Sequence, residues 1–451
     1  MGNLDNRRSS IKNAPVKEME SALEAVVAHF KLKWLQKDGG HPLQSLWQRR
    51  DELSTHELFF FGHCLEKMTD VDAKWTKDMV YIIKTKDHKE RQGAIFEITG
   101  LGTLMNDNQI VVPARKNNPG FDGILKIGND KEMRISIKNY GKSSYKRTFE
   151  YECSKVDKQV KNLIKARKIP SVHLLFEAKS AQYPERNNWE SLVDSLEEIL
   201  RNYNPMKPSP VLIDDYWFGV VRQISDYDPN NLHPEYNSYL LQIFVAYHKN
   251  DEKNLFDKLD EACTNLAKHT DKESDKLVNV VYIHIPESIS IIKCEESVRT
   301  YFDLFPDKPI TGVILYQPSV TNFLENNSSA IHHCYKMVFK NRVISKWIDG
   351  DTISIVPPVG VVSDTPSEAL VVVDHSNLGV ERKMIDIYGK YAFQKGEYFG
   401  MQKHNKNGDL VGSVRKVAAG VALHAVMQPF ADDRAFVIEG RLAIDDELLL
   451  L

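Results

Sequence analysis

The sequence predicts a mixed α/β protein of about three domains, since domains average roughly 150 residues and the chain has 451. Apolar residues recur at helical spacing over the first hundred residues. Short β-rich runs separated by turn residues follow, and helical and strand patterns then alternate. Hydrophobic residues make up 42% of the chain and charged residues 27%. This balance is typical of globular proteins and excludes a fibrous or disordered chain.

The N-terminal part is predicted to be helical. Residues 16–36 carry Met, Leu, Val, Phe and Trp at helical spacing. Residues 56–68 form a second predicted helix. Residues 74–104 are also mostly helical in pattern, with a break near Asp87. We expect these segments to bury their apolar faces together.

Between residues 109 and 139 the apolar period changes from helical to alternating. Turn residues such as Asn117 to Gly120 separate the short runs, which indicates antiparallel strands. A strongly amphipathic helix, a strand and another helix follow. The predicted elements are strands over 109–113, 121–127 and 133–139, a helix over 144–168, a strand over 171–177 and a helix over 189–203.

Three prolines in residues 204–210 mark the clearest domain boundary. After it the pattern alternates between strands and helices, and beyond about residue 331 short strands with hairpin signals dominate. The predicted division is a helical segment over 1–70, an α/β core over 71–205, an α/β domain over 206–330 and a β-rich region over 331–451.

Composition excludes several classes of protein. The formal charge is −3, so any nucleic-acid signal must be local. The five cysteines are widely spaced without a CxxC pair, which argues against a disulfide framework or a zinc ribbon and indicates a reducing cytoplasm. No apolar run reaches 18 residues, so we expect no membrane span.

Polar residues occupy distinctive places in the predicted core. Glu97 lies on the helix before the first strand, Asp122 in the second strand and Lys138 in the third. Ser136 shares a strand face with Lys138 because side chains alternate. The spacing of Asp122 and Lys138 fits two adjacent antiparallel strands. Carboxylates bind Mg²⁺, and a lysine can orient water or stabilise charge, so this set suits phosphodiester hydrolysis.

The pattern of Glu97, Asp122, Ser136-Ile137-Lys138 and the element order αβββαβ resembles the PD-(D/E)XK, or restriction-endonuclease-like, nuclease superfamily over about residues 90–180. The resemblance implies a restriction-endonuclease-like fold and Mg²⁺-dependent cleavage of DNA that leaves a 5′-phosphate. It also implies a role in restriction or antiphage defence. The motif itself is degenerate, since an Asp and a later xxK arise by chance in many proteins.

One position departs from the family pattern, because Ser136 stands where the family has Asp or Glu. Some restriction endonucleases of the superfamily carry Ser here and supply the missing carboxylate from the helix after the lysine strand. In the predicted helix over 144–168, Glu152 lies beside the apolar stripe, closer to it than Glu150. Glu152 is therefore the predicted supporting ligand, with Asp122 and Glu97, and a solvated partner of Lys155 is the alternative.

A basic segment supports the same interpretation. Residues 131–168 contain twelve Lys or Arg against four Asp or Glu. Such residues contact phosphates, and a helix start offers free N–H groups to an anion. The predicted phosphate contacts are Lys142, Ser143, Ser144, Lys146 and Arg147.

The lysines farther along this helix, Lys158, Lys161 and Lys165, recur on one side of it. They fit a solvated helix face as well as a phosphate-binding one.

The sequence thus predicts a cytoplasmic, Mg²⁺-dependent endonuclease acting on DNA, with Mn²⁺ as a possible substitute and no organic cofactor. We expect a homo-oligomer in which residues 206–451 select the target, assemble the subunits or sense a partner. Three alternatives remain open: an inactive nuclease-fold DNA-binding or scaffold protein, an RNA-directed nuclease, and a non-enzymatic member of a larger complex.

Other motifs carry less weight. Gly100-Leu101-Gly102 lacks the third glycine and the preceding strand of a dinucleotide site. His332-His333-Cys334 would point to alternate faces of a strand, so a structural role is expected. The C-terminal leucines fit either a neighbouring subunit or the chain's own sheet.

Overall fold

A computed structural model provides the structure. The residues that it describes are 15–37, 40–48, 52–114, 121–127, 131–140, 144–169, 171–178, 184–204, 207, 209–222, 238–246, 251–267, 277–286, 291–323, 328–340, 354–365, 369–374, 381–386, 392–395, 398–404, 410–416, 423–429, 434–440, 448 and 450–451.

The chain folds into two compact units, and each is built from separate stretches of sequence. Unit 1 comprises residues 1–141, 252–366 and 448–451, and unit 2 comprises residues 142–251 and 367–447. This division differs from the predicted boundaries near residues 70, 205 and 330. The predicted core over 71–205 is divided at residue 141, because the helix that follows packs within unit 2.

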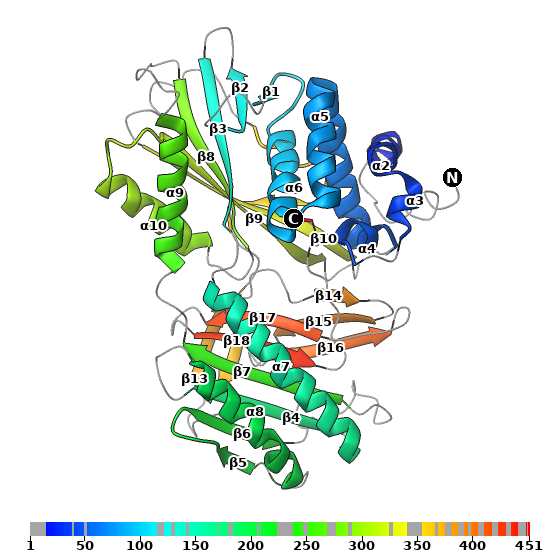
Figure 1. The fold of residues 1–451 in the computed structure, drawn as a ribbon, viewed down its shortest axis with the longest axis vertical. Coiled ribbons are helices and arrows are strands. Elements are labelled where there is room, and N and C mark those ends of the chain that lie inside the picture. Colours follow the sequence, from blue (N-terminus) through cyan, green and yellow to red (C-terminus); the bar gives the residue numbers. More distant parts are fainter. Residues whose placement is uncertain are drawn as a thin grey trace. The chain divides into compact units, whose positions relative to one another are not determined.

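The helices of unit 1 form two groups that are separated in the sequence (Figure 1). Two of the breaks between helical segments are capped. Asp72 is non-helical within α5, and its side chain accepts from the N–H groups of Lys74 and Trp75. Asp87 caps α6 in the same way, as the predicted break near this residue requires. The helices are α2 Val16–Phe30, α3 Leu32–Leu35, α4 Pro42–Gln48, α5 Glu52–Thr85, α6 His88–Thr103, α9 Asp251–Ala267 and α10 Ile291–Leu304.

The sheet of unit 1 has seven strands in the order β1-β2-β3-β8-β9-β10-β11. The first three strands are antiparallel, whereas β3 pairs with β8, and β8 with β9, in parallel. Each of these parallel connections contains a helix, as parallel pairing requires. The strands are β1 Ile110–Pro113, β2 Gly123–Ile127, β3 Lys131–Asn139, β8 Leu277–His284, β9 Gly312–Phe323, β10 Ser328–Phe339 and β11 Val361–Ser363.

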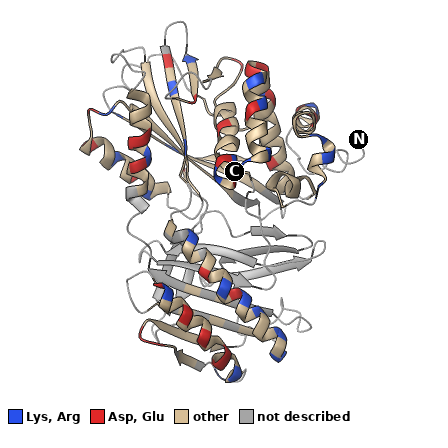
Figure 2. Ribbon diagram, viewed as in Figure 1, with Lys and Arg blue, Asp and Glu red and all other residues tan. Residues whose placement is uncertain are grey.

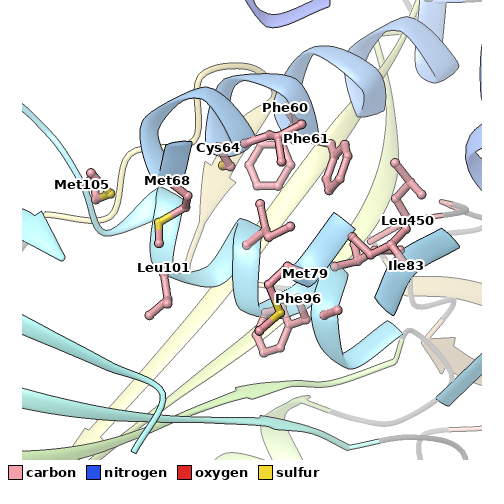
Figure 3. Close-up of a cluster of buried hydrophobic side chains, with 14 of the residues drawn as sticks. Phe60, Phe61, Cys64, Met68, Met79, Ile83, Phe96, Leu101, Met105 and Leu450 are labelled. Atoms are coloured by element: carbon pink, nitrogen blue, oxygen red, sulfur yellow. The ribbon is translucent and has the colours of Figure 1, made fainter. Parts of the chain in front are cut away.

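Both faces of this sheet are covered by helices. Side chains of α2 to α6 form one apolar cluster with alternate strand residues such as Ile135 and Ile137. Figure 3 shows part of it, with Phe60 and Cys64 of α5 and Leu101 of α6 among the side chains drawn. Side chains of α9 and α10 form a second cluster with residues of the opposite face, such as Ile283. Unit 1 is therefore a three-layer α/β/α structure.

Gly102 permits the close approach of α5 and α6. A Cβ atom at this position would lie 2.6 Å from the Cβ of Cys64, a contact that no substituted residue could make without moving the helices apart. The glycines of the Gly100-Leu101-Gly102 sequence therefore serve helix packing. Since they lie inside α6, they form no loop that could hold a dinucleotide.

Unit 2 is a second α/β layer structure. Its eight-stranded sheet has the order β12-β13-β17-β18-β7-β4-β6-β5, and three further strands form a small sheet, β14-β15-β16. Helices α7 and α8 pack on strands β4, β6 and β7 through a cluster that includes Phe149, Trp189 and Trp217.

The helices of unit 2 are α7 Ser144–Arg167 and α8 Arg186–Arg201. Its strands are β4 Ser171–Ala178, β5 Ser209–Leu212, β6 Trp217–Arg222, β7 Ser238–Ala246, β12 Ala369–Asp374, β13 Glu381–Asp386, β14 Ala392–Lys395, β15 Tyr398–His404, β16 Leu410–Lys416, β17 Leu423–Pro429 and β18 Arg434–Gly440.

The predicted α/β class is confirmed, and so is the succession of elements from α6 to β4 along the chain. Their assembly differs from the prediction in one respect. Helix α7 and strand β4 belong to unit 2, so the helix that leads from β3 to its parallel neighbour β8 is α9. None of the helices in the described part of the chain combines the length and the apolar character needed to cross a membrane.

The end of the chain returns to unit 1. Leu448 and Leu450 are buried in the cluster formed by α2 to α6. The N–H of Leu450 donates to Oε2 of Glu57, a fully buried residue of α5, at 2.9 Å. Of the two destinations that the sequence leaves open for these leucines, the structure shows docking within the same chain.

Candidate active site

Asp122 lies directly before β2 and is fixed from three directions. Its N–H donates to the carbonyl of Ile135, and its carbonyl accepts from the N–H of Ala114. Its Oδ2 accepts from the N–H of Ile137 at 2.6 Å. Because the backbone and one carboxylate oxygen are held by neighbouring strands, the side chain has a defined position at the end of the sheet. Its other oxygen, Oδ1, receives no hydrogen bond from any residue in the described ranges.

Ser136 lies beside this carboxylate and is 1% exposed. Its hydroxyl is 3.5 Å from Oδ2 of Asp122, the outer limit of a hydrogen bond. In the sequence Ser136 was expected to face a metal. In the structure its nearest polar contact is Asp122, so it supports that carboxylate.

Lys138 extends to the layer formed by α9. Its Nζ donates to Oε1 of Glu261 at 3.1 Å, and the lysine side chain is only 13% exposed. Strand alternation places Lys138 on the same face as Ser136, as predicted, because Ile135 and Ile137 pack on the other face. The antiparallel pairing of β2 with β3, predicted from the spacing of Asp122 and Lys138, is confirmed.

Glu261 is a site residue that the sequence did not reveal. It lies on α9, 123 residues after Lys138, and also accepts from Lys258 at 3.3 Å. Burial would raise the pKa of Glu261, but the two ammonium groups hold it below the ordinary glutamate value. The sequence offers one signal, a helical pattern over residues 252–268 followed by an apolar strand, and this pattern does not distinguish α9 from α7.

Glu97 and Asp122 are two carboxyl groups that interact electrostatically. Burial and, to a smaller extent, the negative charge of Asp122 raise the pKa of Glu97 to about 8, although the positive charge of Lys138 opposes the shift. Burial also raises the pKa of Asp122, against the stabilising effects of the Ile137 N–H, Lys138 and Ser136. Two acids that resist ionisation in one place are typical of functional sites, because a bound cation can relieve their repulsion.

Close packing of α6 on the strands brings Glu97 to this end of the sheet. Residue 100 of the same helix is glycine, and a Cβ atom there would already contact Ile137 at 3.4 Å. Leu101 packs so closely on Gly123 that a Cβ atom at residue 123 would lie 2.7 Å from its Cδ2. The glycine after Asp122 therefore lets the helix approach the strand that begins there.

Glu152 belongs to a different unit from the residues of this site. Glu152 lies on α7 in unit 2, and both its carboxylate oxygens accept from Lys155 at 2.9 Å. This is the alternative that the sequence left open, a helix charge paired one turn away. The prediction placed Glu152 correctly on a helix after β3, but that helix is part of the unit inserted between β3 and α9.

The predicted phosphate contacts also belong to unit 2 or its boundary. Ser144 and Arg147 are exposed on the first turns of α7. Lys142, Ser143 and the side chain of Lys146 lie outside the described residues.

Within the described ranges, no three His, Cys, Asp or Glu side chains are grouped as a ready-made metal site. The residues at the end of β3 nevertheless have the donor chemistry that Mg²⁺ prefers. This ion commonly uses one or two carboxylates and keeps several waters, so a closed protein cage is not required. Glu97 and Asp122 are the two carboxylates that fit.

The histidines singled out in the sequence have structural partners. His333 contacts the hydroxyl of Tyr316 at 2.9 Å and the carbonyl of Val359 at 2.8 Å, while His332 contacts Ser319. Burial lowers the pKa of His333 to about 3, so it is neutral at pH 7. These contacts agree with the structural role expected for this segment.

Comparison with known proteins gives no relative from which a function could be transferred. No family model matches the chain, and searches of curated proteins and of solved structures gave no significant match. The functional argument therefore depends on the geometry of the site.

Proposed function

We propose that the chain is a Mg²⁺-dependent endonuclease that hydrolyses DNA phosphodiester bonds at the end of β3. The observation that carries the proposal is the meeting of Glu97, Asp122, Lys138 and Glu261, which come from α6, β2, β3 and α9. Their electrostatic coupling links elements up to 164 residues apart in the sequence. Catalytic and metal-binding groups often have pKa values that burial and a specific charged partner shift, as they do for Glu97 and Asp122.

The topology of unit 1 supports the resemblance seen in the sequence. Without the inserted residues 142–251, its central elements read α6, β1, β2, β3, α9 and β8. This is a helix, three antiparallel strands, a crossover helix and a parallel strand, the αβββαβ order of the PD-(D/E)XK superfamily. In this arrangement α9 is the helix after the lysine strand, and Glu261 takes the place predicted for Glu152.

Each side chain has a distinct role in the proposed site. Asp122 and Glu97 would hold the metal ion, which when bound supplies a water of lowered pKa and offsets phosphate charge. Lys138 holds a positive charge near the carboxylates, where it orients the attacking water or stabilises the phosphate as negative charge develops. Glu261 positions the Lys138 ammonium and is the nearest additional carboxylate on the α9 side.

Cleavage of plasmid DNA in millimolar Mg²⁺ or Mn²⁺ tests the proposal. Asp122→Asn keeps an acceptor for the Ile137 N–H but removes the charge, and we expect at least about a 10³-fold loss of activity. Lys138→Met should cost about 10²–10³-fold. Lys155→Met is the matched control, because this lysine also pairs with a glutamate but lies on α7. Equal activity in all four proteins would refute the assignment.

A second candidate is a nuclease-like DNA-binding protein without catalysis. It is favoured by Ser136 in the family's acidic position and by the lack of a three-residue metal group among the described residues. DNA binding without metal-dependent cleavage of either duplex DNA or RNA would select this candidate. Cleavage of RNA alone, lost on Asp122→Asn, would keep the site and change the substrate.

A further inference from the structure

The outer face of α7 carries a straight row of basic side chains. The helix has its apolar stripe toward the sheet of unit 2, at Phe149, Val156 and Val160. On the opposite side lie Arg147 and Lys158, both exposed, followed by Lys165. At 100° per residue the three fall within about 20° of one another around the axis. Figure 2 shows the resulting concentration of blue along this helix.

The charge of α7 differs from that of its neighbour α8, which packs in the same cluster. Helix α7 contains seven Lys or Arg against three Asp or Glu, whereas α8 contains two Arg against four Asp or Glu. Both arginines of α8 pair with a glutamate four residues away, the arrangement expected of a solvated helix. The exposed face of unit 2 is therefore basic over one helix and acidic over the other.

Only part of the α7 charge is neutralised within the protein. Three of its basic residues form ion pairs: Lys155 with Glu152, Lys161 with Asp157, and Arg167 with Glu197. Among the described residues, Arg147, Lys158 and Lys165 have no ion-pair partner. The unpaired members are the ones that form the row.

Helix stability accounts for only part of this arrangement. Lys165 lies in the last turn, where the helix dipole favours positive charge. The first turn holds no acidic residue, and Arg147 lies near the N-terminus, where positive charge opposes the dipole. Arg147 therefore costs the helix stability, and an external anion would offset that cost.

We infer that the Arg147, Lys158 and Lys165 face of α7, in unit 2, binds the backbone of duplex DNA. The inference deepens the proposed function, from which it takes DNA as the partner. Arg147 and Lys165 are about 27 Å apart along the helix, the axial length of roughly eight base pairs. Tyr151, which is 60% exposed, lies between Arg147 and Lys158 on the same face and can add a contact to sugar or phosphate.

Binding of the full chain to a duplex oligonucleotide, measured by fluorescence anisotropy in EDTA over a range of salt, tests this inference. The variant Arg147→Glu/Lys158→Glu/Lys165→Glu should bind at least about tenfold more weakly, and the slope of log K against log salt should fall by about 3. The control is Lys33→Glu/Lys74→Glu/Lys77→Glu, which makes the same charge change at exposed lysines of unit 1. It should bind like wild type.

The outcomes separate this inference from the proposed nuclease activity. A wild type that binds through α7 but never cleaves DNA upholds the inference and refutes the proposed activity. Cleavage by wild type together with unchanged affinity and salt slope in the α7 variant refutes the inference alone. Equal weakening in both triple variants would show a general charge effect and also refute it. Tighter α7-dependent binding to duplex RNA than to DNA would refute the choice of DNA.

Discussion

The Lys138–Glu261 pair of unit 1 and two ion pairs of unit 2 hold charged side chains in different ways. In unit 1 the Lys138–Glu261 pair joins β3 to α9 across 123 residues, and its lysine is largely removed from water. In unit 2 the ion pairs of Glu152 and Arg201 close within about one helical turn, and their partners Lys155 and Glu197 are 47% and 55% exposed. Short-range surface pairs contribute little and need no tertiary fold. A long-range, partly buried pair exists only if the tertiary fold holds its two elements together, so it depends on the packing of distant segments.

The largest effect expected from this comparison is on the rate of DNA cleavage when either of the two glutamates is replaced. Glu261→Gln should lower metal-dependent cleavage by about 10–100-fold, because the amide no longer holds the Lys138 ammonium by charge. Glu152→Gln should change the rate by less than about twofold, since its partner Lys155 is solvated. The rates are measured under single-turnover conditions with the same plasmid.

The two glutamines make a matched pair, because each replaces one helical carboxylate that accepts from a lysine. Thermal unfolding of both variants checks that neither has lost its fold. A larger loss from Glu152→Gln than from Glu261→Gln would reverse the assignment and return α7 to the catalytic core.

This contrast also shows how far sequence reasoning reaches. The pattern of residues 109–139 was enough to predict three strands and to bring Asp122 beside β3, because tight turns allow little freedom between neighbouring strands. The sequence could not show that Glu261, rather than Glu152, lies beside Lys138. Both lie on amphipathic helices followed by apolar strands, and which helix crosses to the next parallel strand depends on contacts made after an insertion of about a hundred residues.

A smaller effect is expected from the protonation of Glu97. Since its pKa is raised to about 8, a metal ion must displace a proton from it below that pH. The apparent Mn²⁺ affinity should therefore rise up to about tenfold per pH unit from pH 6 to 8 and level off above. Calorimetric titrations at several pH values measure this, and Glu97→Gln should bind more weakly with a flatter profile.

The raised pKa of Glu97 also makes the stability of the folded protein depend on pH. This pKa is raised from the ordinary glutamate value of 4.5 to about 8, so between these two pH values the folded state holds a proton that the unfolded state has lost. Stability should fall as pH rises from about 4.5 to about 8. Glu97→Gln should therefore be more stable than wild type at pH 8, with the difference vanishing near pH 4.5. An unchanged difference across this range would contradict the raised pKa.

The smallest effect is expected from Leu450 and Leu451, and it tests whether unit 1 can be destabilised without unit 2. Leu450→Ala removes a side chain that is 6% exposed in the cluster of α2 to α6, at a cost of about 2–3 kcal/mol. Hydrogen exchange should quicken in α5, while α8 in unit 2 keeps its protection. Leu451→Ala, at a half-buried position, is the milder control. Equal quickening in both helices would show that the two units unfold together.

The insertion of unit 2 after β3 also has a consequence for biosynthesis. Strand β3 ends at residue 139, whereas its parallel partner β8 ends at residue 284. At 5–20 residues per second a ribosome needs about 7–29 s to make the intervening chain. Throughout that time one edge of β3 has no partner strand, and an open edge is a template for wrong pairing between nascent chains. Slow translation or a shortage of chaperones should therefore lower the yield of this protein before any mature molecule has unfolded.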